Sequence, residues 1–204
     1  MKTIYFDNNA TTQVADEVYQ AMEPYFRTLY GNPSSMHTFG GQVGIKVREA
    51  RESVARLLGC DPSEIIFTSC GTESDSTAIL GTLSAVPHRR KVITTRVEHP
   101  AVLTVCRDLE SRGYTVIELS VDKLGRLDLS ELEHHLDDDT ALVTIMYANN
   151  ETGVIFPIEQ IAERVTSRGV VFHTDAVQIV GKMPLNLASS RINLLSLSGH
   201  KLHA

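Results

Sequence analysis

The sequence predicts an α/β protein with a mostly parallel sheet and helices on both faces. Short apolar runs alternate along the chain with longer segments of helical period. This alternation is typical of strand–helix–strand units, in which helices cover both faces of a parallel sheet. The strands that it predicts are residues 65–67, 91–94, 115–119, 141–146, 170–172 and 192–197.

The clearest helical segment lies in the first third of the chain. Its apolar residues recur at a spacing of three and four, which places them on one face of a helix. They are Val43, Val47, Ala50, Val54, Leu57 and Leu58. Gly59 follows at once and is expected to end the helix. The Gly-Asn-Pro-Ser-Ser run at residues 31–35 predicts a loop that leads into it.

The composition is that of a globular protein, and it excludes several function classes. Hydrophobic residues make up 42% of the 204 residues, and the net charge of −6 (19 basic against 25 acidic residues) argues against a general nucleic-acid binder. No apolar stretch is long enough for a signal peptide or a membrane helix. Cys60, Cys70 and Cys106 have no metal-ligand spacing, and three cysteines cannot all pair within one chain. We therefore expect a reduced, cytoplasmic protein without a bound metal, a membrane or a nucleic-acid partner.

An acidic and a basic residue at the ends of expected strands are typical of a site for an aldehyde cofactor. Asp175 follows the strand at residues 170–172, and Lys201 lies in the Ser-Gly-His-Lys turn after the strand at residues 192–197. A lysine amine can form an imine with the aldehyde of pyridoxal phosphate, while a carboxylate keeps the pyridine nitrogen protonated. Alone, Asp175 could equally cap a helix, and Lys201 is one of nineteen basic residues.

Residues 68–74 (Thr-Ser-Cys-Gly-Thr-Glu-Ser) follow an expected strand and open an expected helix. Gly71 permits a tight turn, and the free N–H groups of the new helix, with the Thr72 hydroxyl, form an anion site suited to a phosphate. The alternative is an ordinary helix cap, which is common at such positions.

Two further segments follow strands. Pro100 can occupy the first turn of a helix and hold His99 at its mouth, where an imidazole could stack on a planar ring and move protons. A surface histidine is the alternative. In residues 147–153, the amides of Asn149 and Asn150 could donate hydrogen bonds to a ligand, or the segment could simply be a turn.

Seven segments occur in an order that closely resembles one known family. They are residues 7–12, 31–35, 68–76, 98–102, 148–153, 173–178 and 198–203. They resemble the class V aminotransferases of the pyridoxal-phosphate fold type I, and within them the cysteine desulfurases of the nitrogen-fixation type. The resemblance implies that residues 16–204 are the cofactor-binding large domain, incomplete at its C-terminal end. Residues 1–15 are expected to pack with a small C-terminal domain that the chain lacks.

The resemblance also implies roles for individual residues. Lys201 corresponds to the imine-forming lysine, Asp175 to the partner of the pyridine nitrogen, and His99 to the histidine that stacks on the ring and handles protons. Gly71, Thr72, Ser198 and His200 match phosphate-binding positions. Gln178 matches the partner of the ring hydroxyl oxygen, and Asn150 a residue near both the cofactor and the substrate carboxylate.

The activity that the resemblance implies is conversion of L-cysteine to L-alanine by a cytoplasmic homodimer. Its sulfur leaves as an enzyme persulfide for an iron–sulfur scaffold or another acceptor protein, with nitrogenase maturation as the expected purpose. Two alternatives remain at this point. One is another enzyme of the class, either a selenocysteine lyase or a small-molecule aminotransferase. The other is an inactive fragment that acts as a binding subunit.

The chain departs from the family in its length. Family members are about twice as long, and the missing part carries the persulfide-forming cysteine and the arginine that binds the substrate carboxylate. Cys60, Cys70 and Cys106 match no part of the nucleophile motif, and we expect Cys70 to pack as a small residue under the phosphate turn. Residues 1–204 alone are therefore expected to be inactive.

Overall fold

The computed structural model describes residues 3–204, which divide into two compact units. The first unit comprises the described residues up to Phe67 together with Pro184–Ser189 and Gly199–Ala204. The second comprises Thr68–Met183 and Ser190–Ser198. Each is described by itself below.

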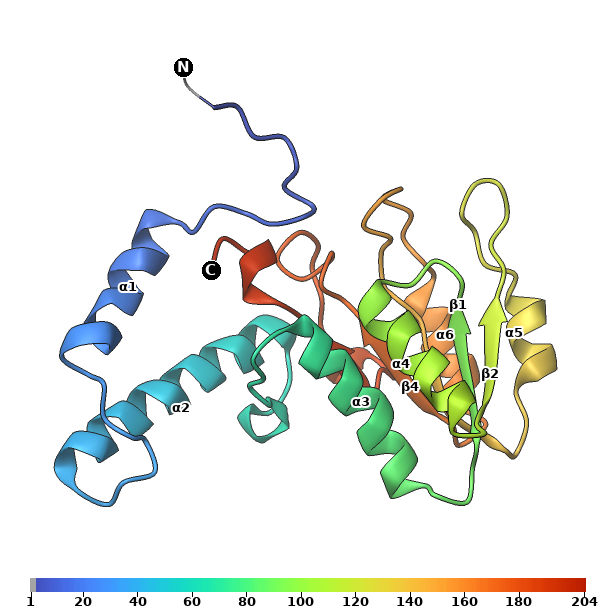
Figure 1. Cartoon of the computed structure of the whole chain (residues 1–204), viewed down its shortest axis with the longest axis horizontal. Coiled ribbons are helices and arrows are strands. Elements are labelled where there is room, and N and C mark those ends of the chain that lie inside the picture. The colour runs from blue at the N-terminus through green and yellow to red at the C-terminus, as the bar shows by residue number, and fades with distance from the viewer. Residues whose placement is uncertain (1–2) are drawn as a thin grey trace. The chain divides into compact units, whose positions relative to one another are not determined.

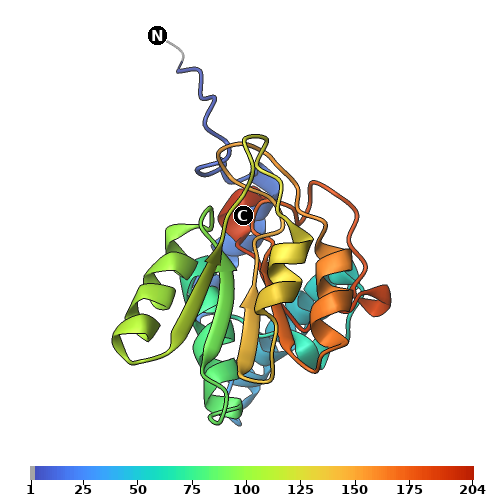
Figure 2. The same ribbon diagram turned by 90° about the vertical axis from the view of Figure 1, so that its right-hand side faces the viewer.

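The second unit contains a five-stranded sheet in which every neighbouring pair of strands is parallel. The strand order is β2-β1-β3-β4-β5, and the strands lie side by side in Figure 2. The predicted α/β fold with a parallel sheet is therefore confirmed. The strands are β1 (Lys91–Thr95), β2 (Thr115–Leu119), β3 (Thr140–Thr144), β4 (Val171–Asp175) and β5 (Leu194–Ser196).

Helices cover both faces of this sheet, as predicted (Figure 1). Successive strand residues point to opposite faces. Leu142 accordingly joins the apolar cluster beneath α3 (Gly71–Ala85) and α4 (Pro100–Ser111). Its neighbour Val143 joins the cluster beneath α5 (Leu129–His135) and α6 (Ile158–Thr166). Both residues are fully buried, as expected for strands covered on two sides.

The first unit contains two helices, α1 (Asp16–Arg27) and α2 (Thr38–Leu58), and the short 3-10 turns η1 (Pro62–Glu64), η2 (Leu187–Ser189) and η3 (Gly199–Lys201). The helix and the preceding loop that the sequence predicts here are confirmed. Gly59 ends α2 with a φ of 71°, and its N–H donates to the Ala55 carbonyl. Only glycine adopts this left-handed conformation without strain.

One predicted strand is wrong, and one ends early. Residues 65–67 form no strand, because no described segment pairs with them, and the side chains of Ile66 and Phe67 are 76% and 50% exposed. The strand expected at residues 141–146 ends at Thr144. Beyond it the Met146 N–H donates to the carboxyl group of Glu98, whereas the N–H groups of Ile145 and Tyr147 still donate to the β4 carbonyls of His173 and Asp175. No helix within residues 3–204 is long and apolar enough to span a bilayer.

Candidate functional site

The order of the strands marks one edge of the second unit as a binding site. From β1 the chain moves outward to β2 and then returns to place β3 on the other side of β1. In open α/β sheets, ligands bind beyond the carboxyl ends of the strands at the point where the order reverses. Residues 96–99 follow β1 and residues 145–153 follow β3, so two of the segments singled out in the sequence lie at this switch point.

Buried polar groups tie these two loops together. Both carboxyl oxygens of Glu98 accept the Met146 N–H at 3.0 Å, and Oε1 also accepts the Thr95 hydroxyl at 2.7 Å. From the other loop, Nδ2 of Asn149 donates to the Val97 carbonyl at 3.0 Å. Burial raises the pKa of Glu98 to about 8. The loop that carries His99 is thus anchored to the loop that carries Asn150.

His99 caps α4, and Pro100 occupies the first turn of that helix, as the sequence predicts. Nδ1 of His99 accepts the Ala101 N–H at 3.2 Å. Because Nδ1 is an acceptor, a neutral ring carries its hydrogen on Nε2. The residue is exposed, and the cap bond fixes the position of its ring.

The side-chain amides of Asn149 and Asn150 differ in burial and in their hydrogen-bond partners. Asn149 is buried, and its Oδ1 accepts the N–H groups of Glu151 and Thr152 at 3.0 Å and 2.9 Å. Gly153 completes the turn with a φ of 72°. The turn interpretation therefore describes Asn149. Asn150 is half-buried, and its Nδ2 donates to the Glu151 carboxylate at 2.8 Å.

The start of α3 lies against the ends of β4 and β5. A Cβ on Gly71 would lie 3.5 Å from Cβ of Ser198, 3.9 Å from its hydroxyl oxygen, and 3.5 Å from Cγ2 of Val177. Thr72, the second residue of the helix, is exposed. The first N–H groups of this 15-residue helix therefore open beside two hydroxyl side chains, Thr72 and Ser198.

The pKa of the Cys70 thiol indicates the electrostatic potential at the start of α3. The Glu73 N–H and the Ser69 hydroxyl lower the pKa of its thiol, so this position favours an anion. The expectation that Cys70 packs under the turn is wrong, because its side chain is exposed. Its extended backbone (φ −166°) precedes the helix. Cys106, in contrast, is buried in α4, and burial raises the pKa of its thiol to about 12.

Asp175 is a buried acidic residue at the carboxyl end of β4. It is 6% exposed at the last position of β4, and its Oδ1 accepts the Val177 N–H at 2.9 Å. Turns rather than a helix follow it, so the alternative that Asp175 caps a helix does not hold. Gln178 is half-buried in these turns, and its Oε1 accepts the Lys182 ammonium at 2.9 Å.

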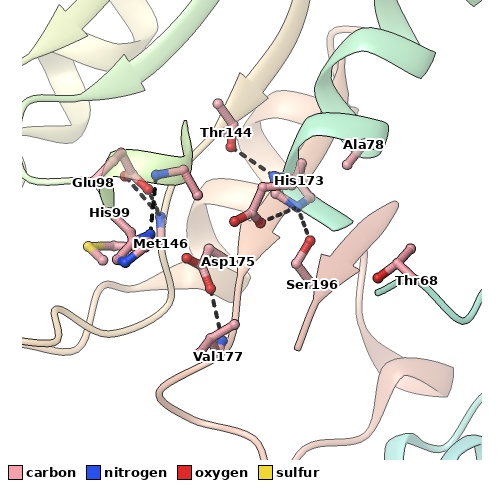
Figure 3. A network of polar contacts seen from close by, with 12 residues as sticks. Thr68, Ala78, Glu98, His99, Thr144, Met146, His173, Asp175, Val177 and Ser196 are labelled. Carbon is pink, nitrogen blue, oxygen red and sulfur yellow. Dashed lines mark hydrogen bonds and ion pairs between the residues drawn. The ribbon is translucent and has the colours of Figure 1, made fainter. Parts of the chain in front are cut away.

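A second layer of buried polar groups lies behind Asp175 (Figure 3). The imidazole of His173 lies within hydrogen-bond distance of the hydroxyls of Thr144 (2.8 Å) and Ser196 (3.0 Å). Asp75 Oδ1 is 3.7 Å from His173 Nε2. Burial lowers the pKa of His173 to about 3, while burial and the charge of Asp175 raise the pKa of Asp75 to about 8. Burial thus favours the neutral form of both groups.

The sequence analysis assigned no role to His173 or Asp75, although the sequence pattern sets each of them apart. His173 and Asp175 are two residues apart on β4, so their side chains point to the same face of the sheet. Asp75 occupies the buried stripe of α3 with Ile79 and Leu83. A carboxyl group in an apolar stripe is unusual enough to attract notice.

Lys201 and His200 belong to the first unit, where η3 meets residues 9–12. The Lys201 ammonium donates to the carbonyl of Ala10 at 2.7 Å and to that of Asn9. His200 Nδ1 lies 3.1 Å from the Thr11 hydroxyl, and the His200 carbonyl accepts the Thr12 N–H at 2.9 Å. Burial, with a smaller effect of the neighbouring Lys201 charge, lowers the pKa of His200.

Comparison with known proteins decides the family. The sequence profile described as "Aminotransferase class-V" matches residues 4–204. The chain belongs to the class V aminotransferase family. Among its relatives, a cysteine desulfurase of Trichormus azollae is 64% identical over 204 residues, which are all of this chain and 51% of the relative. The cysteine desulfurase NifS of Azotobacter vinelandii is 60% identical over 205 residues, again all of this chain and 51% of the relative.

A solved structure supports the same assignment. The structure titled "NifS-like protein" superimposes with a TM-score of 0.95 at 43% identity, covering 98% of this chain and 56% of the other. The prediction of a class V aminotransferase with the fold-type-I architecture is therefore confirmed. The chain spans about half the length of the curated relatives it matches.

Class V aminotransferases are pyridoxal-phosphate enzymes, and residues of this chain fit that cofactor. The anion-favouring start of α3, with the Thr72 and Ser198 hydroxyls, suits a phosphate. The buried carboxyl group of Asp175 suits a protonated ring nitrogen. The first unit of this class V chain supplies a primary amine on Lys201. The chemistry of these donors thus matches a phosphate, a pyridinium and an aldehyde.

Proposed function

We propose that this chain is the cofactor-binding part of a cysteine desulfurase, which converts L-cysteine to L-alanine and releases the sulfur as an enzyme persulfide. The observation that carries the proposal is the 64% identity to a cysteine desulfurase across all 204 residues. That identity extends over every segment in which a site residue was predicted.

The proposed roles divide the site by chemistry. Pyridoxal phosphate, when bound, supplies an electron sink for the α-carbon of an amino acid. Lys201 holds the cofactor covalently and then acts as the general base at that carbon, and Asp175 keeps the ring nitrogen protonated. The phosphate group is proposed to bind four residues, Gly71, Thr72, Ser198 and His200. Gln178 is proposed to contact the hydroxyl oxygen of the ring. Asn150 is proposed to lie near both the cofactor and the substrate carboxylate.

His99 is proposed to stack on the cofactor ring and to move protons. Its cap bond to Ala101 fixes the ring at the start of α4, where the residue is exposed. An imidazole can act as a general acid or a general base. The anchoring of its loop through Glu98 and Asn149 supports this role, because proton transfer requires a fixed donor–acceptor distance.

We further propose that the complete enzyme is a cytoplasmic homodimer. Its sulfur is passed to an iron–sulfur scaffold or another acceptor protein, and the similarity to NifS supports nitrogenase maturation as the purpose. Residues 1–15 are proposed to pack with the small domain, and residues 16–204 to be the cofactor-binding large domain, incomplete at its C-terminal end. Light scattering of the complete protein measures the dimer directly.

The proposal is tested by comparing the complete, cofactor-loaded protein with residues 1–204 alone. The complete protein is expected to form alanine and sulfide from cysteine, and the shorter chain neither. The shorter chain is also expected to aggregate, because α1 buries no residue and Phe6, Phe26 and Ile66 are 90%, 74% and 76% exposed. At about 25 cal/mol per Å², several hundred Å² of uncovered apolar surface rivals the stability of a whole domain.

Two results would contradict these expectations. A monodisperse, cooperatively melting chain of residues 1–204 that forms alanine from cysteine would place the nucleophile within this segment. A complete protein that releases selenide from selenocysteine but no sulfide from cysteine, or that only transfers amino groups, would move the assignment to another class V enzyme.

Substitution of His99 by Ala in the complete enzyme is expected to slow turnover by about a hundredfold or more, because proton transfer and ring stacking are lost. The cofactor should remain bound through Lys201. Stopped-flow absorbance after mixing with cysteine is expected to show the first spectral change and then a stall. His88→Ala, which changes an exposed histidine in the loop after α3, is the matched control. Normal progress to product in His99→Ala would remove the proposed role.

A further inference from the structure

Glu98 is a buried acidic residue whose carboxyl group joins the two loops at the switch point of the sheet. It directly precedes His99 in the chain, and it is 5% exposed. Both of its oxygens accept the Met146 N–H at 3.0 Å (Figure 3), and Oε1 also accepts the Thr95 hydroxyl at 2.7 Å. Thr95 ends β1 and Met146 follows β3, so one carboxyl group connects the segments after two neighbouring strands.

A second buried side chain makes the same connection in the opposite direction. Asn149 is 8% exposed, and its Nδ2 donates to the Val97 carbonyl at 3.0 Å. Its Oδ1 accepts the N–H groups of Glu151 and Thr152, so the loop after β3 is folded around this amide. That folded loop is therefore bonded to the residue before Glu98, and Glu98 is bonded back to the start of the same loop.

The hydrogen-bond partners of Glu98 indicate which property of the side chain matters. They are a backbone N–H and a hydroxyl, both uncharged donors, while the His99 ring makes its own bond to the Ala101 N–H. A glutamine can accept from the same backbone N–H with its Oε1 and donate from its amide to the Thr95 hydroxyl oxygen. Burial, which raises the pKa of Glu98 to about 8, also favours an uncharged group. The carboxyl group therefore contributes hydrogen-bond geometry rather than charge.

We propose that Glu98 is a positioning residue, which fixes His99 relative to the loop that carries Asn150 through its bond to the Met146 N–H. This inference rests on the proton-transfer role proposed for His99. The backbone of His99 is held on both sides, by the bonds of Glu98 before it and by the cap bond to Ala101 after it. A displacement of about 1 Å can slow a positioned catalytic group by about a hundredfold, so loss of this anchor has a measurable effect.

The first test is amide hydrogen exchange of the complete protein, measured by mass spectrometry. Glu98→Ala is expected to speed exchange about tenfold or more in both loops, residues 96–99 and 145–149, because the bond that joins them is lost. Glu98→Gln should exchange like the wild type. Leu109→Ala, which removes a buried side chain from the apolar cluster beneath α3 and α4, controls for general destabilisation and should leave both loops unchanged.

Faster exchange in only one loop of Glu98→Ala, or in neither, would overturn the proposal. Should this variant fail to fold, Asn149→Asp decides in its place. It keeps the Oδ1 acceptor of the turn but loses the amide that donates to Val97. It is expected to speed exchange in residues 96–99, and wild-type exchange there would contradict the connection.

The second test is a double-mutant cycle, which shows whether Glu98 acts through His99. At saturating cysteine, Glu98→Ala is expected to slow the step that stalls in His99→Ala by about tenfold or more, whereas Glu98→Gln should stay within about threefold of the wild type. Added to His99→Ala, Glu98→Ala should cause no further slowing, because residues that act through one another are not additive. Equal slowing in both backgrounds would overturn the proposal. The exchange test uses no cysteine, so failure of the desulfurase assignment is distinguishable from failure of this inference.

Discussion

Replacement of Lys201 by Ala in the complete enzyme is expected to reduce cysteine turnover to background, because no other amine is proposed to hold the cofactor and to remove the α-proton. Lys201→Arg should fail as well, since a guanidinium stays protonated and cannot form the covalent link. Borohydride reduction followed by peptide mapping measures the attachment directly. The wild type is expected to carry a pyridoxyl group on the peptide that contains Lys201, and both variants none.

The control for this experiment is Lys123→Ala, which removes an exposed lysine between β2 and α5. It should keep both the label and the turnover. A pyridoxyl group found on another lysine of the wild type would refute the assignment, whatever the activity of Lys201→Ala.

Asp175→Asn is expected to slow α-proton abstraction by about a hundredfold, a loss typical of removing one electrostatic stabiliser from an active site. A carboxylate favours a protonated ring nitrogen, whereas an amide does not. The phosphate contacts of Thr72, Ser198 and His200 do not depend on this charge, so the cofactor should remain bound. Turnover of α-deuterated cysteine measures the step, because its isotope effect grows as proton abstraction becomes rate-limiting.

Asp138→Asn is the control for this substitution, because it makes the same chemical change at an exposed position before β3. Wild-type turnover in Asp175→Asn with the cofactor bound would exclude the electron-sink role.

Much of the fold could be predicted because its signals are local. Alternation of apolar runs with helical stripes predicted the parallel sheet and its two helical layers, since each strand and helix carries its own period. Gly59 predicted the end of α2, because a left-handed residue is nearly always glycine. Pro100 likewise predicted the start of α4 and the place of His99 at its mouth. The motif order indicated the family, which the match over residues 4–204 confirms.

Contacts between distant segments decided the features that the sequence did not predict. Residues 65–67 have a strand's composition, but a strand needs a neighbour, and none among the described segments pairs with them. The Met146 N–H, just after β3, is taken by Glu98, which lies 48 residues earlier in the chain. The raised pKa of Asp75 and the lowered pKa of His173 are caused by their burial. The sequence alone thus determined the fold class, most of the strands and the family. Tertiary structure determined which polar groups are buried and therefore which protons they hold, because desolvation depends on segments that pack together from far apart in the chain.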